Sequence, residues 1–133
     1  MRNKNLQILY AQQDFYDFLV SFFALDKAKY FIWAPLGRYA AALRVEPYKE
    51  GLLLEALETA PNARREGYGA ALLQAVLREL KESEYQIVYS HVNKRNRASL
   101  NVHKKCGFSI ISDSATYVDG TITQNSYTLC YNL

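Results

Sequence analysis

The stretch Ala63–Leu73 reads ARREGYGAALL and places two arginines and a Gly-Tyr-Gly step at the mouth of a predicted helix. The N-terminus of a helix offers unpaired backbone N–H groups and the positive end of the helix dipole. Glycine lacks the Cβ atom that would keep a ligand's oxygens from the backbone, and Arg64 and Arg65 add positive charge. The stretch therefore suits an anion such as a pyrophosphate, although a plain strand-to-helix turn explains it equally well when it is taken alone.

The same residues exclude two well-known phosphate-binding motifs. The Gly-Lys-Ser/Thr ending of a P-loop is missing after Gly69. A Rossmann fingerprint is also absent, because only one Gly-x-Gly is present, at Gly67-Tyr68-Gly69, and the first strand–helix unit comes late in the chain. The segments around the stretch must therefore decide what it does.

Those segments predict a βαβ unit. LLLEALET at Leu52–Thr59 and QIVYSHV at Gln86–Val92 have the apolar and β-branched composition of strands. Between them, the apolar residues of an amphipathic helix fall on one side: Leu72, Leu73, Val76, Leu77 and Leu80. The two strands should therefore be parallel neighbours in one sheet.

The remainder of the chain predicts antiparallel strands and two further helices. Phe15, Phe18, Leu19, Phe22 and Phe23 recur with the helical period and predict a helix over residues 12–25. Further strands are predicted at Tyr30–Leu36, Tyr39–Val45, Phe108–Tyr117 and Ser126–Asn132, with turns at Pro35–Gly37, Glu46–Gly51 and Asp119-Gly120. A helix is predicted over Arg97–Lys105 and ends at Cys106-Gly107. The fold class is α/β (mixed α+β), in a single domain over residues 1–133.

Composition limits the kind of protein this is. At 133 residues, with 50% hydrophobic and 22% charged residues, the chain has the make-up of a folded protein with one core. The net charge of +3 does not favour nucleic acid as a partner but suits an anionic small ligand. We find neither a signal peptide nor a membrane span. Cys106 and Cys130 form no metal-ligand spacing and no disulfide framework, so we expect no metal and a cytoplasmic location.

A second motif, NRASLNVHKKCGF at Asn96–Phe108, opens the helix that follows the second parallel strand. Asn96, Ser99 and His103 are spaced three and four apart, so they share one helical face beside the βαβ cleft. Asn96 alone is explained as an N-cap, and Ser99 as a small residue that a helix tolerates. Three polar residues together on that face favour a ligand contact.

Together the two motifs resemble the GNAT superfamily of acetyl-CoA-dependent N-acetyltransferases. The resemblance covers the chain from about Tyr30 to the C-terminus, and it implies a largely antiparallel sheet with a central parallel, splayed strand pair flanked by helices. It departs at the N-terminus, where one helix is evident instead of two and the opening strand must fit into Leu6–Tyr10. The motif residues are R-x-x-G-x-G (Arg64, Gly67, Gly69) and N-x-x-S…G-F (Asn96, Ser99, Gly107, Phe108).

The resemblance implies acetyl-CoA as the co-substrate. The backbone N–H groups of residues 65–70 are expected to hold its pyrophosphate, and Asn96 and Ser99 to contact or order the pantetheine arm between the splayed strands. The residues expected to bind the cofactor are Leu57, Thr59, Arg64, Arg65, Glu66, Gly67, Tyr68, Gly69, Ala70, Asn96, Ser99 and His103.

The catalytic groups are expected on the helix and on the first parallel strand. His103 takes the place where the family often has a tyrosine that acts as the acid, or it packs beside the cofactor. Glu55 is the first candidate for the base and Glu58 the second, and strand alternation puts these two on opposite faces of the sheet. A salt bridge from Glu55 to Arg44 is the alternative. His91 is a third candidate, with a structural role as its simpler interpretation.

The leading hypothesis is an enzyme that transfers acetyl directly from acetyl-CoA to a primary amine of a small molecule or a protein. The alternative is a non-catalytic CoA-binding sensor or interaction module. Acetylation of a charged tRNA or a ribosomal protein is a third option, which the charge permits without supporting. Dimers are frequent in the superfamily, so a homodimer is also an option.

Overall fold

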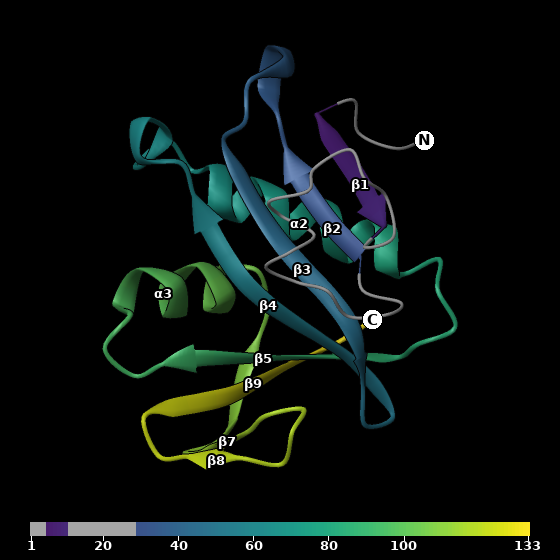
Figure 1. The fold of residues 1–133 in the computed structure, drawn as a ribbon, viewed down its shortest axis with the longest axis vertical. Coiled ribbons are helices and arrows are strands. Elements are labelled where there is room, and N and C mark those ends of the chain that lie inside the picture. The colour runs from purple at the N-terminus through teal and green to yellow at the C-terminus, as the bar shows by residue number, and fades with distance from the viewer. Residues whose placement is uncertain (1–4, 11–28) are drawn as a thin grey trace.

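The computed structural model describes residues 5–10 and 29–133. The helix predicted over residues 12–25 lies outside them. A seven-stranded sheet, in the order β1-β2-β3-β4-β5-β9-β6, runs through the molecule, and two strands form a separate small sheet (Figure 1). The strands are β1 (Leu6–Tyr10), β2 (Lys29–Trp33), β3 (Ala41–Tyr48), β4 (Gly51–Thr59), β5 (Ile87–Asn93), β6 (Ser109–Ser112), β7 (Ala115–Thr116), β8 (Ile122–Thr123) and β9 (Ser126–Asn132). The helices are α2 (Tyr68–Leu80) and α3 (Arg97–Lys105).

The architecture confirms the predicted mixed fold. Every strand pair in the large sheet is antiparallel except β4 and β5, which are parallel and joined through α2. The opening strand is found at Leu6–Tyr10. The strand expected at Tyr30–Leu36 stops at Trp33, because Pro35 begins a single 3-10 turn. The strand expected at Tyr39–Val45 instead runs from Ala41 to Tyr48.

One predicted strand is wrong. Residues 108–117 form two short strands, β6 and β7, in different sheets. The pairing of β6 with β9 becomes irregular between Ile110 and Ser112. Beyond it, the backbone N–H of Ser114 donates to the Ser112 hydroxyl at 3.2 Å. This local turn directs the chain away from the large sheet, so β7 pairs with β8 around the Asp119-Gly120 turn.

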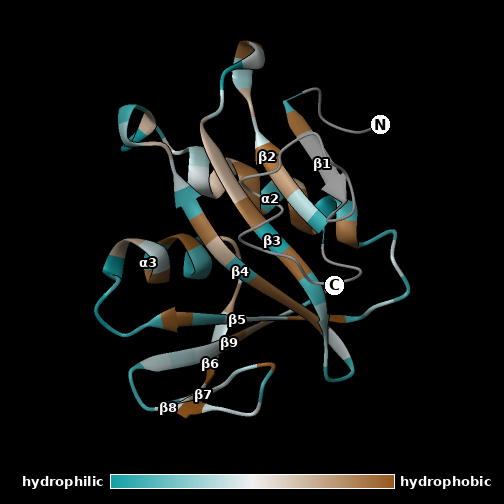
Figure 2. Ribbon diagram, in the orientation of Figure 1, coloured by the Kyte–Doolittle hydropathy of each residue, from teal (hydrophilic) through white to brown (hydrophobic). Residues whose placement is uncertain are grey.

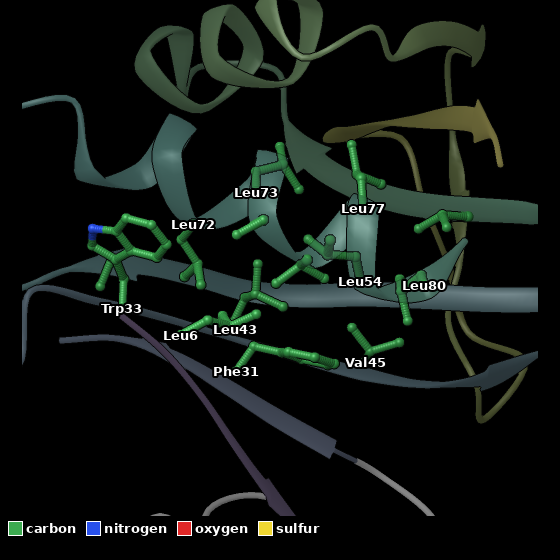
Figure 3. Close-up of a cluster of buried hydrophobic side chains, with 14 of the residues drawn as sticks. Leu6, Phe31, Trp33, Leu43, Val45, Leu54, Leu72, Leu73, Leu77 and Leu80 are labelled. Atoms are coloured by element: carbon green, nitrogen blue, oxygen red, sulfur yellow. The ribbon is translucent and has the colours of Figure 1, made fainter. Parts of the chain in front are cut away.

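The hydrophobic core lies between α2 and one face of the large sheet. Figure 3 shows the leucines of α2 directed toward side chains from β2, β3 and β4. Leu72 and Leu73 are 0% exposed, and Leu43 and Leu54 opposite them are 2% and 1% exposed. Burial of such side chains contributes about 1.5–3 kcal/mol each, which fixes α2 on the sheet. Hydrophobic residues accordingly recur along the central strands (Figure 2).

The predicted alternation of side chains along β4 is wrong beyond Glu55, because the strand contains a β-bulge. Arg44 pairs with Glu55 and Ala42 pairs with Glu58, so β4 has one residue more than β3 over this interval. Ala56 takes up the extra residue with a positive φ of 55°. Since paired residues point to the same face, Glu55 and Glu58 share one face instead of lying on opposite faces. The bulge also brings Thr59 to the face covered by α2.

The parallel strands separate soon after they meet. β4 and β5 pair only at Leu52 with Val88, Leu53 with Tyr89, and Leu54 with Ser90. Both strands continue beyond these pairs, and α3 lies beside their diverging ends (Figure 1). The splayed parallel pair expected from the resemblance is therefore present.

Candidate active site

A cavity of about 960 Å³ lies where the end of β4, the start of α2, and α3 meet. We call it the helix-side cavity. Ten of the expected cofactor residues line it: Leu57, Thr59, Arg64, Arg65, Gly67, Tyr68, Gly69, Ala70, Asn96 and Ser99. Glu66 and His103 are not part of its wall, and Glu66 is exposed. The structure thus brings together both sequence motifs, which are far apart in the chain.

The start of α2 leaves its first backbone N–H groups without a capping side chain. Gly67 is the N-cap, with a left-handed φ of 79°, and no side chain caps the helix. The first turn holds no acidic residue that would oppose an anion. Arg65, two residues before Gly67, also has a positive φ, of 67°. The N–H groups of this first helical turn lack intrahelical acceptors and remain available to a ligand.

A smaller cavity, of about 190 Å³, fills the space where β4 and β5 part. We call it the gap cavity. Residues 54–57 of β4 form one wall, residues 90–93 of β5 another, and Asn96, Ser99 and His103 of α3 close it. Leu57, Asn96 and Ser99 also line the helix-side cavity. The two cavities are therefore adjacent.

Asn96 fixes the start of α3. Its side-chain oxygen accepts a hydrogen bond from the Ser99 backbone N–H at 3.1 Å, which confirms the N-cap interpretation. The helix ends at Lys105 with Cys106 as its C-cap, and Gly107 follows with a φ of 102°, as the predicted stop requires. Both ends of α3 are thus set by local residues, which places His103 over β5.

His103 is buried in a hydrogen-bond chain. Its side chain is 1% exposed, its Nδ1 lies 2.7 Å from the Ser99 carbonyl oxygen, and its Nε2 lies 2.8 Å from the Ser90 hydroxyl. Because a carbonyl oxygen only accepts, Nδ1 carries the proton and Nε2 accepts from Ser90. Burial lowers the pKa of His103, against a smaller raising effect of the Ser99 bond. The imidazole is therefore neutral at neutral pH.

Sequence reasoning missed Ser90. It is 2% exposed and lines the gap cavity. The segment QIVYSHV predicts a buried strand with His91 as its candidate functional residue, and Ser90 is not among the predicted site residues. A hydroxyl within an apolar strand was a usable signal, but its partner lies on another element and could not be identified from spacing.

On the face of the sheet opposite α2, a third cavity of about 570 Å³ is lined by residues of β3, β4 and β5 and by residues 117–119. We call it the far-face cavity. Glu55, Ala56 and His91 line both this cavity and the gap cavity. The three cavities therefore follow one another through the gap in the sheet, from the face with the helices to the opposite face.

Glu55 is engaged in an ion pair. Arg44 contacts the Glu55 carboxylate and lies 3.1 Å from the Glu46 carboxylate. The salt bridge from Glu55 to Arg44, the alternative to a catalytic role for Glu55, is thus present. Burial raises the pKa of Glu46, and the neighbouring Arg44 partly offsets this. Glu58 shares the face of Glu55 but lies nearer the end of β4, where it lines the helix-side cavity and accepts a hydrogen bond from the Tyr39 hydroxyl at 2.9 Å.

His91 stands between the gap cavity and the far-face cavity. Its Nε2 is buried and has no hydrogen-bond partner among the described residues. The rings of Tyr48 and Tyr117 pack against the imidazole in T-shaped arrangements, with centroids 5.6 Å and 5.5 Å away. Burial, and to a lesser degree Lys49, lowers the pKa of His91. A neutral imidazole with an open nitrogen is what a proton acceptor requires.

Within the described ranges, no group of three or more His, Cys, Asp or Glu side chains is arranged to hold a metal. No helix in that part of the chain has both the length and the apolar composition to cross a membrane. Cys106 and Cys130 are both free thiols.

Comparison with known proteins places the chain in a family. The model of the acetyltransferase (GNAT) family matches residues 2–108. The chain therefore belongs to this family, and the resemblance carried by the two motifs is confirmed. Members of the family are acyltransferases. Among curated proteins, no relative matches the sequence significantly.

Solved structures share the fold at low identity. A GNAT family acetyltransferase from Elizabethkingia anophelis with acetyl-CoA bound has a TM-score of 0.72 and 14% identity, covering 98% of this chain and 100% of its own. A Bacillus subtilis acetyltransferase in complex with CoA has a TM-score of 0.73 and 11% identity, covering 97% and 98%. The ribosomal-protein-S18-alanine N-acetyltransferase from Escherichia coli has a TM-score of 0.71 and 17% identity, covering 96% and 93%. These likenesses concern the fold alone.

Proposed function

We propose that this protein transfers an acetyl group from acetyl-CoA directly to the primary amine of a small molecule or protein. The observation that carries the proposal is the series of three cavities through the splayed strands. The helix-side cavity and the gap cavity share Leu57, Asn96 and Ser99, and the gap cavity and the far-face cavity share Glu55, Ala56 and His91. A cofactor on one face and an acceptor on the other would meet in the gap.

The helix-side cavity suits the CoA portion. The uncapped first turn of α2 would hold the pyrophosphate, and Arg64 and Arg65 would add charge. A Cβ atom on Gly67 would meet no protein atom within 4 Å, so the backbone there is open to a ligand. The pantetheine arm would follow Leu57 and Thr59 into the gap, where β4 has no paired partner in β5 after Leu54. Acetyl-CoA supplies the activated acetyl group.

His91 is the base that this geometry favours. An amine must lose a proton before or during attack on a thioester. Glu55, the first candidate from sequence, is held by Arg44, whereas the Nε2 of His91 has no hydrogen-bond partner in the part of the chain that the structure describes, and His91 lines the gap cavity. A water at the far-face cavity would carry the proton onward to solvent. Glu55 then orients Arg44 and shapes the acceptor site.

In the resting protein His103 is neutral, because burial disfavours the doubly protonated ring, so His103 does not itself bring the proton that the leaving thiolate needs. In the neutral form, the only ring proton is given to the Ser99 carbonyl. This observation supports the second candidate function, a CoA-binding sensor without turnover. The far-face cavity, which His91 lines, supports the enzyme more strongly. A sensor has no need of a cavity on that face.

The experiment is a thiol-release assay with acetyl-CoA and a panel of amines, which includes small primary amines, peptides with a free N-terminus and lysine peptides. We expect acetyl-dependent thiol release with at least one amine, and mass spectrometry should show that amine acetylated. CoA binding by calorimetry, with no release on any amine, would favour the sensor instead. Absence of CoA binding would exclude both.

A further inference from the structure

The chain Ser90–His103–Ser99 has the geometry of an activated nucleophile. A hydroxyl becomes nucleophilic when a neutral base accepts its proton and a third group holds that base in place. Here the Ser90 hydroxyl lies 2.8 Å from His103 Nε2, and the Ser99 carbonyl holds Nδ1 at 2.7 Å. The base can therefore receive the proton without first changing its tautomer.

The position of Ser90 fits this chemistry as well. Leu54 pairs with Ser90 at the last paired position, so Ser90 stands where the two strands begin to part. Its side chain lines the gap cavity together with the bulged residues 55–57 of β4. Both members of the pair are nearly fully enclosed, at 2% and 1% exposed. Little bulk water competes there with the hydroxyl for an acyl group.

We propose that Ser90 accepts the acetyl group of acetyl-CoA when no amine is bound, so that the protein acetylates itself in the gap cavity. The inference rests on the proposed function, because it requires the thioester to reach this cavity. The Ser90 oxygen forms a bond to the acetyl carbonyl carbon, and the carbon–sulfur bond of the thioester breaks. The proton passes from Ser90 to His103 Nε2 and then to the departing sulfur. The products are acetyl-Ser90 and free CoA, and His103 returns to its neutral state.

A buried serine–histidine bond can also be purely structural, since buried polar groups are normally paired. The two roles differ in one measurable way. A structural pair leaves Ser90 unmodified, whereas a nucleophile leaves an acetyl ester on one defined side chain. The ester is detectable without knowledge of the acceptor, which makes the inference testable on the protein alone.

The experiment treats the full chain with isotopically labelled acetyl-CoA in the absence of amines and maps the label by tandem mass spectrometry. We expect label on Ser90. His103→Gln should lower the rate of labelling at this site by about 100-fold or more, because general-base assistance is lost. Ser90→Ala should remove the label from this peptide. Uncatalysed acetylation of surface lysines serves as an internal control and should be equal in all variants.

Ser126→Ala is the matched control, because Ser126 is also buried but lines none of the three cavities. It should label at Ser90 at the rate of the unaltered protein. Calorimetric CoA binding by every variant verifies that the cofactor site is intact. CoA binding and amine acetylation without label on Ser90 would overturn this inference and leave the proposed function standing. Absence of CoA binding in the unaltered protein would overturn both.

Discussion

His91 lines two cavities, and its buried Nε2 has no hydrogen-bond partner among the described residues. These two features set its expected pH behaviour. A base must be neutral to accept a proton, and burial holds the pKa of His91 below its ordinary value. Activity should therefore be retained as pH falls toward about 6.5, the usual histidine pKa, and should be lost only below it. The measurement is kcat/KM for an identified acceptor between about pH 5 and about pH 9.

Substitutions can distinguish His91 from Glu55, the carboxylate that the sequence favours as the base. His91→Gln should lower kcat/KM by about 100-fold or more and remove the acid limb of the profile. Glu55→Gln should change the acceptor KM more than kcat, because Glu55 is paired with Arg44. If Glu55→Gln removed the acid limb and His91→Gln kept it, Glu55 would be the base.

The buried His103 links stability to pH. Its folded pKa is lowered by burial, so the folded state binds fewer protons than the unfolded state at mildly acidic pH. The stabilising contribution is complete above the unfolded pKa of about 6.5 and is lost as pH falls below it. Urea denaturation at about pH 7.5 and about pH 5.5 should show the loss. His103→Gln should make the free energy of unfolding less dependent on pH, and an unchanged dependence would contradict the burial of a neutral ring.

At the scale of elements, two glycine substitutions at the start of α2 distinguish the effect of backbone strain on stability from the effect of a side chain on CoA binding. Gly67 has a φ of 79°, so Gly67→Ala should destabilise the protein by about 1 kcal/mol and also weaken CoA binding. At Gly69, a Cβ atom would lie 3.6 Å from Thr59 Oγ1, an ordinary contact, so Gly69→Ala should fold normally. Because Gly69 lines the helix-side cavity, that variant should still bind CoA more weakly.

A third glycine provides the control for this pair. Gly120 has a φ of 89° and lies outside the helix-side cavity. Gly120→Ala should therefore lose stability without losing CoA affinity. Thermal denaturation and calorimetric titration together distinguish the three variants. Full CoA affinity in Gly69→Ala would remove the first turn of α2 from the binding site.

At the bulge in β4, two substitutions of Ala56 should change the stability of the fold in opposite directions. Ala56 holds a φ of 55°, which a residue with a Cβ atom adopts at a cost of about 1 kcal/mol or more. Ala56→Gly should therefore stabilise the fold, and Ala56→Val should destabilise it because a β-branched side chain is excluded from this region. Urea denaturation measures both changes. A loss of stability in Ala56→Gly would show that the bulge is not strained.

These elements also show what sequence can predict. The apolar stripe of α2, the Asn96 cap and the Gly107 stop are local signals, and the structure has them at the predicted places. The bulge was not predictable, because alternation assumes that each strand residue has one partner across the ladder. One extra residue at Ala56 therefore moved Glu58 to the face of Glu55. The Ser90–His103 bond was missed for the same kind of reason, since it joins two elements whose contact depends on the whole sheet.

For the molecule as a whole, the sheet separates the two proposed substrate sites. Arg64 lies on the helix-side cavity and Tyr117 on the far-face cavity, and neither lines the other's cavity. Arg64→Ala should raise the KM for acetyl-CoA by about tenfold, the effect of losing one charged hydrogen bond, and leave the acceptor KM unchanged. Tyr117→Ala should raise the acceptor KM and leave CoA affinity unchanged. Both side chains are at least partly exposed, so neither change should unfold the protein.

The double variant tests whether the two sites are independent. Groups without shared partners contribute additively, so Arg64→Ala combined with Tyr117→Ala should show the product of the two single effects on kcat/KM. Initial-rate measurements in which both substrates are varied give each KM and show whether both must be bound before acetyl leaves CoA. Intersecting lines are expected, because direct transfer requires acceptor and thioester to meet in the gap. A strong effect of Tyr117→Ala on CoA affinity would place the acceptor and the cofactor on the same face and contradict the path through the sheet.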